Sequence, residues 1–157
     1  ALILLAFWAI FIFIRVYDLK HKIVPDGAVY TMSAIGVLDI LLRGEPTRFF
    51  YGFVLFVPFF LLWFLSRGRL MGLGDGKIAL ALGLALPIAT SSSGIILAFW
   101  IGAAYAILKI GVEKFGLYSD IKKTTMKSEL PFVPFIFLGT FLAFYLSLDI
   151  LGLNLWM

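Results

Sequence analysis

The stretch Gly72-Leu73-Gly74-Asp75-Gly76-Lys77 places one carboxylate among three glycines at the start of an apolar segment. An ionisable side chain at the edge of hydrocarbon loses favourable hydration, so it is by default a hypothesis for a functional site. Glycine has no Cβ and lets another backbone approach closely, as an extended peptide substrate would. Two interpretations of Asp75 are open at this point: a reactive carboxylate, or a cap for a helix that begins near Lys77.

The composition around this stretch is that of an integral membrane protein. The chain has 157 residues, of which 62% are hydrophobic and 14% are charged, which is too apolar for a water-soluble domain of this size. It contains no cysteine, so a disulfide framework, a thiolate zinc site and a cysteine nucleophile are excluded. The net charge of +4 is distributed between apolar runs and not over one soluble face. We therefore expect the lipid bilayer, and no nucleic acid, as a partner.

The apolar segments predict an all-α fold, a bundle of about six transmembrane helices in one polytopic domain, residues 1–157. The fourth segment is short, because twelve residues of helix rise only about 18 Å against a hydrocarbon core of about 30 Å. A re-entrant segment is the alternative there, and we expect an uncharged turn, Thr90–Gly94, after it. The predicted spans are Ala1–Ile14 (extending to about Asp18), Ala28–Leu42, Phe49–Leu65, Ile78–Ala89, Ile95–Val112 and Leu130–Leu151.

Other polar residues have plainer interpretations. Asp26 follows Pro25, and its interpretation as a helix cap is favoured over a direct catalytic role. Asp39 lies four residues before Arg43, which predicts an ion pair along one helix face. His21 is the only histidine and is expected in an exposed loop position, not as a metal ligand or a general base. Neither a metal nor a cofactor is expected.

The basic residues predict the orientation in the membrane. Arg43 and Arg48 are the two on one side, and a re-entrant fourth segment would separate the lysine-rich segment 113–129 from Arg67 and Arg69. Six full spans are therefore favoured, with both termini outside and the basic loops in the cytoplasm. The eleven on the cytoplasmic side are Arg15, Lys20, Lys22, Arg67, Arg69, Lys77, Lys109, Lys114, Lys122, Lys123 and Lys127.

The alternation of six spans across the membrane also places two carboxylates on the same side. Asp18 closes the first span and Asp75 opens the fourth, so both are expected on the cytoplasmic side at a similar depth. Two carboxylates that share one site cannot both ionise cheaply, so one keeps a proton while the other acts as a base on a bridging water. Such a pair can hydrolyse an amide bond without a metal or a covalent intermediate.

The chain resembles the type IV prepilin peptidase family, membrane aspartyl proteases of the GxGD kind that are distantly similar to archaeal preflagellin peptidases and presenilins. The resemblance rests on Asp18 with the loop that closes on Pro25-Asp26, on Gly72-Leu73-Gly74-Asp75 with Lys77, and on Leu130-Pro131-Phe132-Val133-Pro134-Phe135. It extends in order over nearly the whole chain.

The resemblance implies an aspartic endopeptidase of the inner membrane that cuts the basic leader from pilin-like or pseudopilin precursors after a glycine. Asp18 and Asp75 would be the catalytic pair, facing the cytoplasm, with Gly72, Gly74, Lys77 and Pro131 binding substrate or shaping the site. Many bacterial members also carry a cysteine-containing cytoplasmic region and methylate the new amino terminus. This chain has no cysteines, so methyl transfer is not implied for it.

Two rival interpretations differ in how far the sequence favours them. A phosphate-binding loop is excluded because Gly72 and Gly76 are too close together and Ile78 stands where a hydroxyl residue is needed. A small transporter or membrane scaffold is the serious alternative, because intramembrane carboxylates also serve proton relays. A transporter would place its charged groups near the middle of the membrane and not at one surface.

Overall fold

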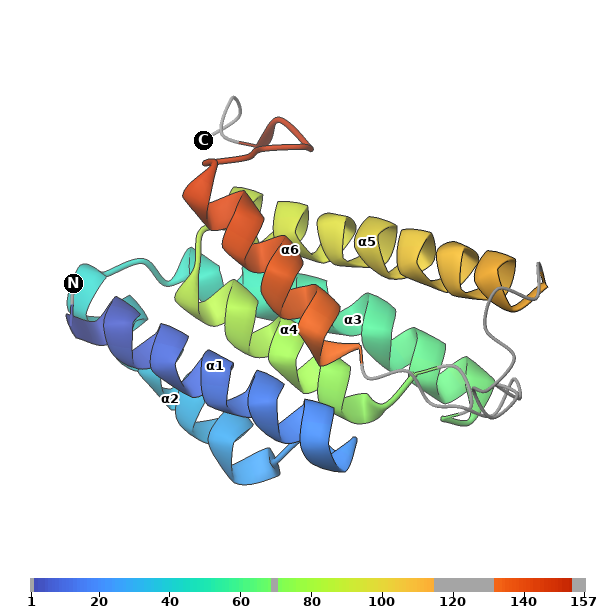
Figure 1. Ribbon diagram of the computed structural model, residues 1–157. Coiled ribbons are helices and arrows are strands. Elements are labelled where there is room, and N and C mark those ends of the chain that lie inside the picture. Colours follow the sequence, from blue (N-terminus) through green and yellow to red (C-terminus); the bar gives the residue numbers. More distant parts are fainter. Residues whose placement is uncertain (1, 69–70, 115–131, 154–157) are drawn as a thin grey trace.

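The computed structural model describes residues 2–68, 71–114 and 132–153, and every long regular element in them is a helix. The predicted all-α membrane bundle is confirmed, with six helices in these residues (Figure 1). Pro131, Arg69 and the lysine-rich segment lie outside the described residues. The helices are α1 (Leu2–His21), α2 (Asp26–Arg43), α3 (Thr47–Ser66), α4 (Leu73–Ala85), α5 (Ile88–Lys114) and α6 (Val133–Tyr145).

Helix α4 is the centre of the bundle. It packs against α2 and α3 and also contacts α5, while α1 packs on α2 and α6, and α5 packs on α6 (Figure 1). Eight of its thirteen residues are buried, including Ile78, Ala81 and Leu82. A helix surrounded by protein does not need to match the thickness of the lipid, which explains how so short a helix can lie inside the bundle.

Close approach of α3 and α4 depends on glycine. A Cβ added at Gly83 would lie 2.7 Å from the Cα of Gly52, a separation that real Cβ atoms do not adopt. Small residues at such a contact let two helix backbones approach and gain van der Waals packing, which is the main source of helix association in lipid. The contact fixes α4 against the long apolar helix α3.

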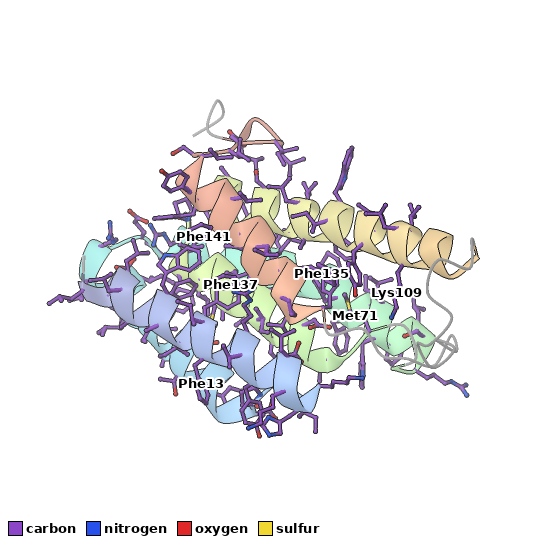
Figure 2. The ribbon with its side chains drawn as sticks, viewed as in Figure 1. Phe13, Met71, Lys109, Phe135, Phe137 and Phe141 are labelled. Carbon is purple, nitrogen blue, oxygen red and sulfur yellow. The ribbon has the colours of Figure 1, made fainter. Side chains whose placement is uncertain are left out.

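The outside of the bundle is apolar. Three helices, α1, α3 and α5, are long and apolar enough to cross a membrane, and α6 is a shorter apolar helix. Figure 2 shows aromatic side chains around the bundle, among them Phe13 on α1 and Phe141 on α6. A surface that exposes so many large hydrophobic side chains is stable in lipid and not in water. The most exposed large side chains include Trp100, Tyr145, Phe50 and Phe64.

The expected turn at Thr90–Gly94 is wrong, because α5 begins at Ile88 and these residues are helical. The hydroxyls of Ser91 and Ser92 donate to the backbone carbonyls of Pro87 and Ile88, so both serines are buried in the helix without losing hydrogen bonds. The chain turns instead at Leu86-Pro87, where proline precedes the helix and needs no N–H partner.

The interpretation of Asp26 as a helix cap is also wrong. Pro25 is the N-cap residue of α2 and Asp26 is the first helical residue, with no side-chain cap hydrogen bond. Its carboxylate accepts a hydrogen bond from Lys77 instead. His21 is exposed, as predicted, but it is the last residue of α1 and not part of a loop, and its Nδ1 lies 3.3 Å from the carbonyl oxygen of Tyr17.

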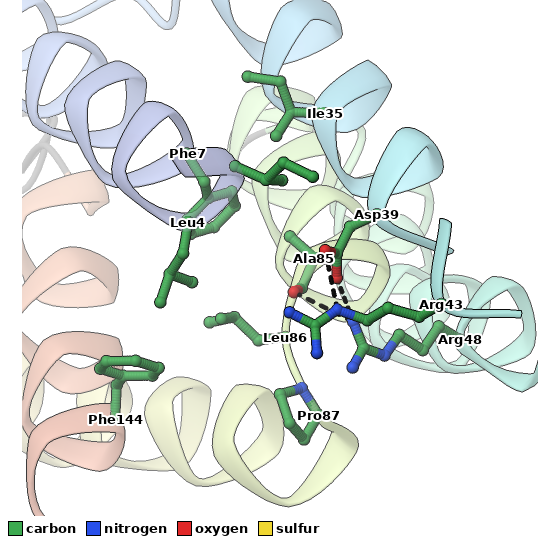
Figure 3. A pocket seen from close by; sticks show the side chains of 11 residues that line it. Leu4, Phe7, Ile35, Asp39, Arg43, Arg48, Ala85, Leu86, Pro87 and Phe144 are labelled. Atoms are coloured by element: carbon green, nitrogen blue, oxygen red, sulfur yellow. Dashed lines mark hydrogen bonds and ion pairs between the residues drawn. The ribbon is translucent and has the colours of Figure 1, made fainter. Parts of the chain in front are cut away.

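A cluster of charged side chains lies where α2, α3 and α4 meet at one end of the bundle. The predicted pair of Asp39 with Arg43 is confirmed, with Nε of Arg43 2.9 Å from Oδ1. Arg48 of α3 was not predicted to join it, yet its Nη1 lies 2.8 Å from Oδ2 of Asp39 and its Nη2 lies 2.6 Å from Glu45. The cluster borders a cavity of about 150 Å³ whose other wall is apolar, formed by Leu4, Phe7 and Phe144 (Figure 3).

The two arginines of this cluster offer a matched pair for a stability test. We expect Arg48→Met to lower the free energy of unfolding by about 3 kcal/mol, because it leaves the buried carboxylate of Asp39 without its buried partner. Arg43→Met should cost less than about 1 kcal/mol, because the Arg43 side chain is 56% exposed. Unfolding of the purified variants in detergent measures both, and equal losses would contradict the assignment of Arg48 as the buried partner.

Candidate active site

The structure brings Asp18 and Asp75 to the same end of the bundle. Asp18 lies near the end of α1 and Asp75 lies in the first turn of α4. Asp18 is 4% exposed and Asp75 is 8% exposed, and the two carboxylates are close enough to interact electrostatically. The cluster around Asp39 lies at the other end, because α4 begins beside the first turn of α2 and ends beside Arg48.

Asp18 and Asp75 differ from the carboxylates of Asp26 and Asp39 in that they form no ion pair among the described residues. Asp39 binds two arginines and Asp26 binds Lys77, whereas neither Asp18 nor Asp75 has an ion-pair partner in the part of the chain that the structure describes. One oxygen of Asp18, Oδ2, is buried and has no hydrogen-bond partner among the same residues. Buried carboxylates without cations are costly to a fold, which marks them as candidates for chemistry.

Two helix N-termini partly offset this cost. Asp75 lies in the first turn of α4, and Asp18 accepts a hydrogen bond from the backbone N–H of Val133 at the start of α6. The exposed N–H groups of a helix N-terminus stabilise a nearby negative charge. Asp75 is not the cap that one interpretation offered, because Gly72 is the N-cap and no side chain makes a cap hydrogen bond.

The glycines before Asp75 have different surroundings. A Cβ added at Gly74 would lie 2.8 Å from the side chain of Val24, so this glycine makes room for the connection between α1 and α2. Among the described residues, a Cβ added at Gly72 would meet only the backbone nitrogen of Gly74, at 3.9 Å, so no described side chain fills the space beside Gly72. The neighbour that Gly74 accommodates is therefore a side chain of the protein itself, whereas the space beside Gly72 is not filled by a described side chain.

Lys77 pairs with a residue of α2 and forms no ion pair with Asp18 or Asp75. Its Nζ lies 2.6 Å from Oδ1 of Asp26 and 5.4 Å from the centre of the Tyr30 ring. Both partners lie in the first turns of α2, so this lysine ties the start of α4 to the start of α2. Pro131, the remaining residue predicted to shape the site, lies outside the described residues.

Arg15 is a partly buried arginine on the same face of α1 as Asp18, and its only predicted role was to mark the cytoplasmic side. It lies three residues before Asp18 on α1, and its guanidinium lies 4.9 Å from the centre of the Phe137 ring of α6. Its Nε is buried without a hydrogen-bond partner among the described residues. The spacing in the sequence could have predicted that Arg15 and Asp18 share a helix face, since residues three apart on a helix are neighbours. Figure 2 shows Phe137 midway along α6.

No group of three His, Cys, Asp or Glu side chains comes together as a metal site within residues 2–68, 71–114 and 132–153. The chemistry that this arrangement offers belongs to the two carboxylates. Two buried carboxylates that form no ion pair among the described residues cannot both be charged cheaply, which favours one proton shared between them. A protonated and an ionised carboxyl side by side can act as general acid and general base on one water molecule.

Comparison with known proteins identifies a family that the chain matches. A family model described as the type IV leader peptidase family matches residues 3–107, more than half of the chain, and the matched range includes both Asp18 and Asp75. No curated protein and no solved structure matches the chain.

Proposed function

Because the chain belongs to the type IV leader peptidase family, we propose that it is a membrane aspartyl endopeptidase in which Asp18 and Asp75 together activate a water molecule. The observation that carries this proposal is the pairing of two buried carboxylates without cationic partners in the described residues. Structural carboxylates of the same bundle, Asp26 and Asp39, each bind a cation. A purely structural role would favour that arrangement for Asp18 and Asp75 as well.

The reaction uses one ionised and one protonated carboxyl. The ionised carboxylate takes a proton from the water as its oxygen attacks the carbonyl carbon of the scissile peptide, and the protonated carboxyl donates its proton to the carbonyl oxygen. The resulting tetrahedral diol collapses when the carboxyl that took the proton from water passes it to the amide nitrogen, a diol hydroxyl gives its proton to the other carboxylate, and the C–N bond breaks. One carboxyl is again protonated and the other ionised, so the pair is ready for the next substrate.

The proposed substrate is a pilin-like or pseudopilin precursor with a basic leader and an apolar helix. Such a chain has its junction between charged and apolar parts at the surface of the membrane, which is the depth we assign to Asp18 and Asp75. The apolar helix would pack against the exposed apolar side chains of the bundle. The scissile bond must leave the helix before it can be cut, because helical hydrogen bonds shield it from water.

We further propose that the carboxylate end of the bundle faces the cytoplasm across the inner membrane, because basic residues are far more frequent at that end. Single cysteines test this in a chain that has none. We expect Lys20→Cys, exposed at the end of α1, to react with an impermeant thiol reagent only when the cytoplasmic face is accessible. Thr47→Cys, exposed at the start of α3, should react in intact cells, and labelling of both from one side would contradict the orientation.

The deciding experiment is cleavage of a pilin-type precursor by the purified protein in detergent. Product of the expected mass from wild-type protein, and none from Asp75→Asn, would support the peptidase. The transporter alternative predicts no cleavage, together with proton or solute movement across reconstituted vesicles that depends on the same carboxylates.

A further inference from the structure

The connection between α1 and α2, residues 22–25, directly follows the turn of α1 that holds Asp18, and it rests on the turn that holds Asp75. Val24 of this connection fills the space that a side chain at Gly74 would occupy, with its Cβ 2.8 Å from the added Cβ. Val24 is partly buried against the main hydrophobic core. The contact is therefore one of packing, and it leaves no room for even one methyl group on Gly74.

A second contact joins the same two segments through charge. Lys77 donates from Nζ to Oδ1 of Asp26 at 2.6 Å, although the two residues are 51 positions apart in the sequence. The Asp26 side chain is 58% exposed and that of Lys77 is 25% exposed. An exposed ion pair of this kind adds little to the free energy of unfolding. We therefore assign it the role of fixing the position of α4 relative to α2.

The two contacts flank Asp75 in the sequence, one residue before it and two residues after it. Their partners lie in the segment that follows Asp18 without an intervening helix. We propose that Val24 and Asp26 hold the first turn of α4 through Gly74 and Lys77 and thereby set the spacing between Asp18 and Asp75. The four are positioning residues, and the inference rests on the proposed function of the carboxylate pair.

The packing contact can be tested by exchanging volume between the two sides. We expect Gly74→Ala to lower kcat by about tenfold or more, because a displacement near 1 Å in a catalytic pair can cost about a hundredfold. KM for the precursor should change little, since the apolar helix of the substrate binds elsewhere on the bundle. Adding Val24→Ala removes the clash, and the double variant should return to within about threefold of Val24→Ala alone.

Gly72→Ala is the matched control, because the space beside Gly72 does not contain Val24. Whatever loss Gly72→Ala causes, Val24→Ala should not repair it. If Gly74 instead served to admit the substrate backbone, then Val24→Ala would fail to rescue Gly74→Ala as well. That failure, in variants with unchanged unfolding temperature, would overturn the proposal, and so would wild-type kcat in Gly74→Ala.

The ion pair gives a second test that does not depend on packing. Asp26→Asn and Lys77→Met should each lower kcat with little change in unfolding temperature, and the double variant should be no slower than the slower single variant. Independent, multiplying losses would overturn the role of the pair. Wild-type protein and Asp75→Asn are assayed alongside: cleavage by the first and not by the second keeps the proposed function whatever the outcome for the positioning residues, and no cleavage by wild-type protein overturns both.

Discussion

Asp18→Asn and Asp75→Asn are each expected to lower the rate of precursor cleavage by at least about 1,000-fold, and the double variant should be no slower than either single variant. The reason is that the acid and the base act as one unit on one water molecule, so loss of either member removes the whole pathway. Initial rates under single-turnover conditions measure this loss in the chemical step. Cleavage near the wild-type rate by either single variant would exclude the carboxylate pair.

The same variants carry an opposite expectation for stability. Asp75→Asn removes a buried acid that has no cationic partner in the described residues, so the unfolding temperature in detergent should stay the same or rise. Asp39→Asn is the matched control, because Asp39 is as buried as Asp75 but binds two arginines. We expect Asp39→Asn to lower the unfolding temperature and to keep cleavage activity at temperatures where it is folded. A marked loss of stability in Asp75→Asn would indicate a structural carboxylate.

The second large effect is expected in the substrate. Replacing the glycine before the scissile bond of the precursor with valine should suppress cleavage by about 100-fold. Glycine ends a helix at low steric cost and presents a bare backbone, whereas a β-branched residue keeps its side chain between the peptide and the enzyme. We propose that this backbone lies beside Gly72, where a Cβ added to the glycine would meet no described side chain within 4 Å.

A precursor with one leader lysine replaced by glutamine is the control for this substrate series. Its cleavage should change by less than about fivefold, because positive charge in the leader orients the precursor in the membrane more than it binds the enzyme. The end of the bundle that we propose to meet the leader is predicted to be basic itself, so it would offer the leader little attraction. Equal rates for the glycine and valine precursors would contradict this account of substrate selection.

The sequence was sufficient for those features that depend on hydropathy and on the order of segments. Hydropathy predicted a helical membrane bundle, because the cost of burying backbone polar groups in lipid leaves few other solutions. The alternation of spans predicted that Asp18 and Asp75 lie at one end, and the structure places both there. The sequence did not predict where α5 begins, because a run of polar residues resembles a turn. In the structure these serines are helical, and their hydroxyls donate to backbone carbonyls of residues three or four positions earlier.

Tertiary structure decided which of the charged residues have partners. The residues that neutralise Asp26 and Asp39 across the bundle lie 51 and 9 positions away in the sequence, and no local pattern identifies them. The same holds for Gly74, whose neighbour Val24 belongs to another segment. A sequence determines where a polar or small residue falls along a helix, but whether it is paired, packed or left open depends on the side chain that the fold brings opposite it.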